Sequence, residues 1–80
     1  MRLAADELVW KREGTRPYYL YDKYQQPIAA IYDDGEILHY THPQKGDVTK
    51  HMVDSIPTDP KELEEFLEYW KTIIIMQWEG

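Results

Sequence analysis

Five acidic residues near the C-terminal end have the type and spacing of a binding surface. They are Asp59, Glu62, Glu64, Glu65 and Glu68. Residues three and four apart share one face of an α-helix, so this spacing predicts a negative stripe with carboxylates about one turn apart. Such carboxylates can occupy sites that otherwise receive phosphates, and their attraction for basic surfaces weakens with salt. The stripe therefore predicts docking on a basic protein groove, although charged helix faces also commonly serve only solubility.

Tyrosines form a second candidate surface. This surface consists of Tyr18, Tyr19, Tyr21 and Tyr24. A sheet that exposes several rings can stack unpaired bases, as single-strand binders do. Cations such as Lys11 and Arg16 could line one edge of it, but Asp22, Asp33 and Asp34 dilute them. We therefore favour the alternative in which some rings pack beneath a helix and the others cover the sheet or form a protein interface.

The three histidines are weak candidates for metal binding. The adjacent carboxylates, Asp33 and Asp34, are weak candidates for catalysis. His39 and His42 are three residues apart, which puts them on opposite faces of a continuous strand, and His51 would have to fold back toward them. Asp33 and Asp34 are already explained by a turn. The chain has no cysteine, and no serine lies in a nucleophile motif. We expect no metal site, no cofactor and no enzymatic activity.

The size and charge of the chain limit the classes of partner that it is expected to bind. The chain has 80 residues, with 15 acidic against nine basic residues and a formal charge of −6. That balance argues against direct binding to phosphates by charge alone and favours a protein partner with a basic surface. No stretch approaches the ~20 apolar residues that cross a bilayer, so we expect a soluble, cytoplasmic protein without membrane contact. With so small a core, pairing of two copies in a homodimer is an alternative source of stability.

The acidic stripe requires a helix, and the sequence predicts one over about residues 60–77. Asp59 suits the N-cap, Pro60 the first helical position, and Glu62 the reciprocal position of a capping box. Steps of 100° gather apolar residues on one side of this amphipathic helix, with Ile75 opposite them. That side carries Leu63, Phe66, Leu67, Trp70, Ile73 and Ile74. We expect the helix to lie across the sheet through Leu63, Phe66, Leu67, Trp70 and Ile74, so that Trp70→Ala costs ~3–5 kcal/mol if the ring is fully buried.

The residues before the helix predict an antiparallel sheet over about residues 8–42. Segments 8–13, 18–24, 28–32 and 36–40 have the aromatic and β-branched composition of strands, and a helical turn at 4–8 is an alternative start. Asp34 and Gly35 predict a tight primed turn between the last two segments. Residues 43–58 are predicted as a loop with one turn, although residues 48–56 are ambiguous between a short strand and a single helical turn. The whole chain, 1–80, is thus predicted to be a single α+β domain with a meander of three to four strands packed against one long C-terminal helix.

These features favour a protein–protein interaction module without enzymatic activity. Its size and charge are compatible with a small acidic inhibitor from a phage or mobile element, which mimics nucleic acid to block a host complex that binds DNA or RNA. Two alternatives stay open. One is a single-stranded nucleic-acid binder that uses exposed tyrosines, and the other is a small structural subunit that buries its apolar helix side in an assembly.

Overall fold

The computed structural model describes residues 3–44 and 46–79, so Met1, Arg2, Lys45 and Gly80 of the predicted domain lie outside the described residues. Within that part a short 3₁₀ helix precedes the strands, as η1 (Ala5–Glu7). The strands are β1 (Val9–Lys11), β2 (Tyr18–Tyr21), β3 (Pro27–Ile31), β4 (Glu36–Tyr40) and β5 (Val48–Met52), followed by α1 (Pro60–Met76). All neighbouring strands pair antiparallel in chain order. The predicted α+β meander with a C-terminal helix is confirmed.

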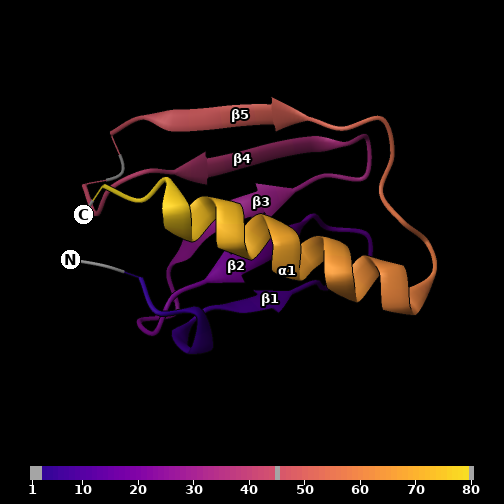
Figure 1. The fold of residues 1–80 in the computed structure, drawn as a ribbon, viewed down its shortest axis with the longest axis horizontal. Helices are drawn as coiled ribbons and strands as arrows, with labels where there is room; N and C mark the ends of the chain where they lie inside the picture. Colours follow the sequence, from indigo (N-terminus) through magenta and orange to yellow (C-terminus); the bar gives the residue numbers. More distant parts are fainter. Residues whose placement is uncertain (1–2, 45, 80) are drawn as a thin grey trace.

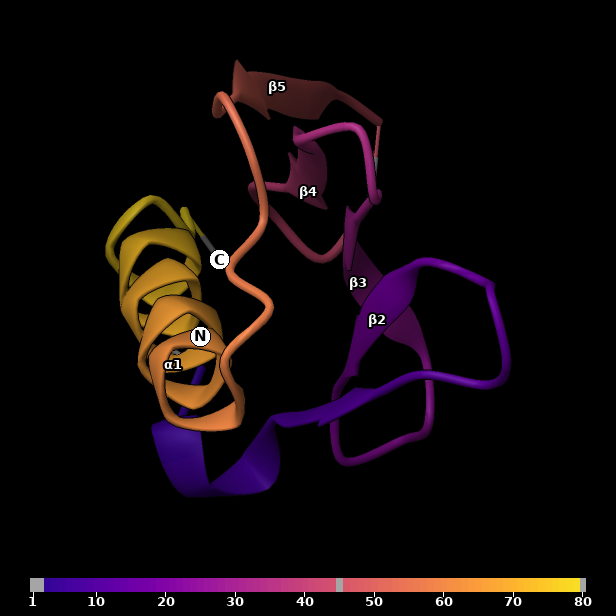
Figure 2. The ribbon, with the colours of Figure 1, turned by 90° about the vertical axis from the view of Figure 1, so that its right-hand side faces the viewer.

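The helix lies on the concave side of the sheet. Figure 1 shows α1 crossing one face of the strands, and Figure 2 shows the sheet curling from β1 at one end to β5 at the other. Strand pairing assigns the two faces, because paired residues point to the same side. Trp10, Leu20, Ala29, His39 and Thr49 form one row across the sheet on the face toward α1. The opposite, outer face carries no helix.

The sheet has five strands, so the prediction of three to four was wrong. The additional strand, β5, lies inside the segment predicted as a loop. Its side chains alternate in exposure, but the half-buried positions hold Thr49 and His51, while the exposed ones hold Val48 and Met52. Polar residues thus point inward and apolar residues outward. This reversal hides the strand from any pattern that relies on buried apolar residues.

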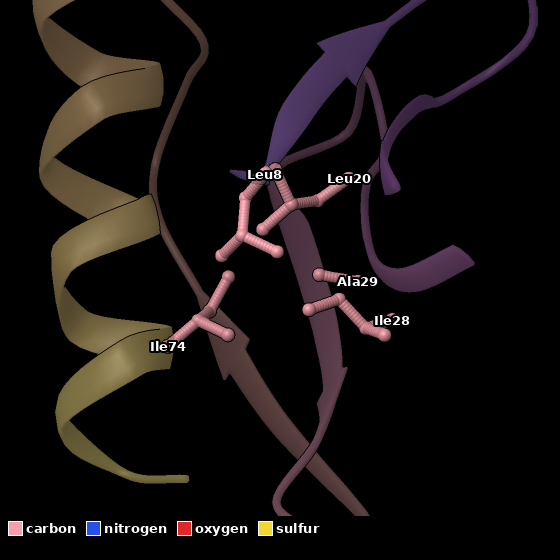
Figure 3. Close-up of a cluster of buried hydrophobic side chains, with 5 residues drawn as sticks. All are labelled: Leu8, Leu20, Ile28, Ala29 and Ile74. Atoms are coloured by element: carbon pink, nitrogen blue, oxygen red, sulfur yellow. The ribbon is translucent and has the colours of Figure 1, made fainter. Parts of the chain in front are cut away.

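The apolar core joins η1, the strands and α1. Leu8, Leu20, Ile28, Ala29 and Ile74 form one buried cluster, and Figure 3 shows Ile74 pointing from the helix toward Leu8. Ile74 is fully buried, whereas Trp70 is half-buried, so the condition for the full cost of Trp70→Ala is not met. Ile75 was expected to point away from the apolar side, but it is half-buried and packs against the same cluster. The end of α1 is therefore its main anchor.

Two polar contacts also hold α1 to the start of the chain. The Trp10 indole Nε1 donates a hydrogen bond to the Leu67 carbonyl at 2.8 Å. The Lys71 ammonium donates to the Leu8 carbonyl at 3.0 Å and to the Ala5 carbonyl at 3.4 Å. Each contact satisfies a polar group that packing partly removes from water. Together they fix the distance between α1 and β1.

The β3–β4 turn depends on Gly35. The Gly35 N–H donates to the Tyr32 carbonyl, and Gly35 has a positive φ of 96°. Asp33 and Asp34, the central residues of this turn, do not share that conformation, so the predicted primed turn was wrong although the hairpin is confirmed. A Cβ at position 35 would meet the Val53 carbonyl oxygen. Only glycine allows this close approach of the chain that leaves β5.

Replacing Ile74 with Ala should lower the free energy of unfolding by about 2–5 kcal/mol, because it leaves a cavity between α1 and the sheet. Urea unfolding followed by circular dichroism measures this change. Met76→Ala is the matched control, since Met76 is exposed on the same turn of the helix. Equal losses from both substitutions would contradict the placement of Ile74 as the anchor.

Replacing Gly35 with Ala should destabilise the chain much more than Gly14→Ala. Both glycines have positive φ, a conformation that costs an alanine about 1–2 kcal/mol. A Cβ at Gly14 meets nothing within 4 Å, whereas one at Gly35 strikes backbone. Thermal unfolding of the two variants compares them directly. Similar melting temperatures would refute the close approach between Gly35 and Val53.

Candidate functional site

Four of the five predicted acidic residues lie exposed on α1, and the fifth caps the helix. Glu62, Glu64, Glu65 and Glu68 are exposed. The Asp59 carboxylate accepts hydrogen bonds from the backbone N–H groups of Lys61 and Glu62, both at 3.1 Å. A carboxylate at this position stabilises the positive end of the helix dipole. Asp59 therefore has a structural role that explains its type without any partner.

The structure divides the remaining acids by their surroundings. Glu64 and Glu68 line a groove of about 400 Å³ between α1 and the edge strand β1. Its apolar wall consists of Leu8, Val9, Trp10, Leu63 and Leu67. Glu62 and Glu65 lie outside this lining. The acidic stripe thus adjoins an apolar groove on one side, which sequence spacing alone did not indicate.

The charges along the groove are unequal. Lys71 lies 3.2 Å from the Glu68 carboxylate, and its side chain is 12% exposed against 61% for Glu68. The ammonium is held in place by the carbonyls of η1 and Leu8, so it partly offsets the charge of Glu68. No ion pair engages Glu64 within residues 3–44 and 46–79. Glu64 is therefore the carboxylate most available to a cation that enters the groove.

The four candidate tyrosines do not form one surface. Tyr19 and Tyr21 lie on the outer face with ring centroids 6.3 Å apart, as their pairing with Lys11 and Val9 requires. Tyr18 alternates to the other face, where the Arg12 guanidinium lies 4.5 Å from its ring centroid. Tyr24 is 66% exposed in the β2–β3 turn. An aromatic surface on the sheet therefore uses Tyr19 and Tyr21 and excludes the other two.

A histidine pair lies on the face toward α1, and the sequence reasoning missed it. His39 Nε2 and His51 Nε2 are 3.1 Å apart, and His39 Nδ1 lies 3.1 Å from the Tyr40 carbonyl. The His51 ring also contacts Trp70, with centroids 5.0 Å apart. The pair depends on β5, whose residues read as loop in the sequence. His42 follows β4 in a bend, and the described residues contain no cluster of three or more histidines and acids that could hold a metal.

Burial gives His39 an altered basicity. His39 is 1% exposed, and this burial lowers its pKa below the ordinary value of 6.5. Hydrogen bonds to the Tyr40 carbonyl and the Gln77 side chain act in the opposite direction, and the nearby charge of a protonated His51 lowers the pKa further. The neutral imidazole is therefore the form that fits between β4 and α1.

Comparison with family models, curated proteins and solved structures finds no match to this chain. No helix among the described residues is long and apolar enough to cross a membrane. The groove, the two sheet faces and the charges that line them are therefore the features from which we infer a function.

The pKa of His39 makes folding sensitive to acid. Because the folded-state pKa is lowered, the unfolded chain binds the proton more readily, so stability falls as pH decreases through 6.5 toward the folded-state pKa. Urea unfolding between about pH 7.5 and 5 should show this loss, and a His39→Leu variant should show a flatter profile. His42→Leu should keep the wild-type profile. An imidazole pKa above 6.5 for His39, measured by NMR, would contradict the assignment.

Proposed function

We propose that this chain is a protein-binding module without catalytic activity, and that it docks through the groove between α1 and β1. One observation carries the proposal. The apolar wall formed by Trp10, Leu63 and Leu67 lies directly beside the exposed carboxylates of Glu64 and Glu68. Apolar burial supplies affinity at an interface, whereas rim charges supply orientation and rate. The groove combines both within the reach of a single inserted segment.

The chemistry of the groove suits a partner segment that carries apolar side chains and at least one arginine or lysine. An apolar residue of the partner would cover Leu63 and Leu67, while its cation would approach Glu64. Arginine fits this arrangement well, because its planar fork can bind a carboxylate through two hydrogen bonds. Glu62 and Glu65 extend the negative potential beyond the groove and would attract the same basic surface during encounter.

A basic surface of this kind is typical of proteins that bind nucleic acid. The exposed carboxylates of α1 would then compete with phosphates for the same cations, as we infer for a small acidic inhibitor encoded by a phage or mobile element. The formal charge of −6 supports such competition, because most of it falls on the C-terminal part that contains α1. Binding of this type is fast and weakens strongly with salt.

Charge reversal by Glu64→Lys together with Glu68→Lys should reduce partner capture about ten-fold or more, because each new ammonium repels the partner's cations. The measurement is an affinity pull-down from a lysate of the source cell or its host, treated with nuclease and quantified by mass spectrometry in low and physiological salt. Glu13→Lys with Asp54→Lys is the control, since both residues are exposed acids outside α1. Equal losses in both double variants would refute the groove.

The apolar wall has its own test. Leu63 and Ile73 are both half-buried on α1, so alanine can replace either with similar cost to folding. Of the two, Leu63 lines the groove. Leu63→Ala should weaken capture of the same partner, whereas Ile73→Ala should leave capture unchanged. Equal losses of capture from both variants would contradict docking in the groove.

A further inference from the structure

The outer face of the sheet carries a row of residues with a cation at each end. Pairing places Lys11, Tyr19, Ala30, Leu38 and Lys50 side by side across the five strands. At about 4.8 Å between neighbouring strands, the row extends for roughly 19 Å. Ala30 is buried, while Tyr19 and Leu38 are half-buried. The middle of the row is therefore a shallow apolar strip, with the unpaired Lys11 at one end and Lys50, which is paired with Glu36, at the other.

Two hollows on this face meet at Tyr19 and Pro27, which line both. The hollow of about 200 Å³ continues over Leu38, Tyr40 and Val48. The second hollow, of about 270 Å³, is lined in addition by Lys11, Glu13, Arg16 and Tyr21. The two hollows adjoin at Tyr19 and Pro27 and together form the depression on this face, with aromatic rings in both hollows and cations in the second.

The cations beside Tyr21 are not neutralised by carboxylates. Lys11 donates a hydrogen bond to Gln25 Oε1 at 3.3 Å and lies 5.5 Å from the centroid of the Tyr21 ring. Neither Lys11 nor Arg16 forms an ion pair within the described ranges 3–44 and 46–79. The carboxylates on this side are Glu13, and Glu36 paired with Lys50 at 2.9 Å. The depression therefore keeps a local excess of positive charge.

Of the acids that diluted these cations in the sequence, Asp34 acts on Lys50, while Asp22 and Asp33 have partners other than Lys11 and Arg16. Asp22 accepts hydrogen bonds from the backbone of Tyr24 and Gln26, both at 2.9 Å, and Asp33 pairs with Arg12 at 2.8 Å. The carboxylates of α1 lie exposed beyond a helix about 10–12 Å thick. That thickness exceeds the Debye length of about 8 Å at physiological salt, so their repulsion is largely screened at the outer face.

We propose that the outer face binds single-stranded nucleic acid, with bases against Tyr19 and Tyr21 and phosphates near Lys11 and Arg16. The two half-buried rings lie 6.3 Å apart and are tilted by 59°, so one base stacks on one ring at a time, and a base on Tyr21 would meet the Lys11 ammonium above that ring. Stacking on rings tolerates any base sequence, and nearby cations supply the attraction for phosphates. This binding is independent of the groove, because the two surfaces lie on opposite sides of the sheet.

Fluorescence anisotropy tests this proposal with labelled oligothymidylate and oligouridylate of about 12 nucleotides. Titrations in about 50 and 200 mM salt should show binding that weakens with salt. Lys11→Glu with Arg16→Glu should reduce affinity about ten-fold or more, and Tyr21→Leu should reduce it about five-fold or more. Lys61→Glu, a single charge reversal, and Tyr69→Leu, both at exposed positions on α1, are the controls on the other side and should alter affinity less than two-fold.

Several outcomes would overturn the proposal. One such outcome is the absence of oligonucleotide binding at low salt with about 100 μM protein. Even non-specific binders respond at this concentration. Equal losses in the control variants would show general electrostatics rather than this face. Binding of a duplex as tight as that of the single strand would exclude stacking on the tyrosines. A dimer that Tyr21→Leu dissociates, without oligonucleotide binding, would assign the face to a second copy of the chain. Because the charge reversal leaves every ring in place, it remains informative if Tyr21→Leu fails to fold.

Discussion

The attachment of α1 to the concave face of the sheet determines which surfaces remain available for binding. Ile74 supplies the apolar part of this attachment, and the Trp10 indole and Lys71 ammonium supply polar contacts to Leu67 and Leu8. All three contacts lie near the chain start or the end of α1. They hold the helix close to β1 but leave the apolar wall between them uncovered, and they leave the outer face of the sheet without a helix. Both candidate surfaces follow from this one-sided packing.

The same arrangement separates charges that are mixed along the chain. Exposed carboxylates gather on α1, whereas Lys11, Arg16 and Lys50 lie around the outer face of the sheet. Across a helix and a sheet these groups interact weakly in physiological salt, because the separation exceeds the Debye length of about 8 Å. A strongly acidic protein can therefore present a locally positive surface. Net charge alone describes neither side of this molecule.

The helix and the first four strands were predictable because their residues follow simple rules. Asp59 and Pro60 begin α1 by capping and fixed φ, and the β3–β4 hairpin follows from a glycine between two apolar runs. The strand β5 was not predictable, because Thr49 and His51 point inward and Val48 and Met52 outward. Missing β5 also meant missing the His39–His51 pair. The acids of α1 were placed correctly on an exposed surface, but their neighbour Val9 was not identifiable, since only tertiary packing brings β1 beside the helix.

The central claim is that a protein partner occupies the groove between α1 and β1. The most direct measurement is photo-crosslinking from a reactive amino acid introduced at position 64 on the groove rim and, separately, at position 52, where Met52 is 61% exposed on β5. Both versions would be exposed to the same nuclease-treated lysate. We expect a protein adduct from position 64 and none from position 52. A protein adduct from position 52 alone, or from neither position, would contradict the central claim.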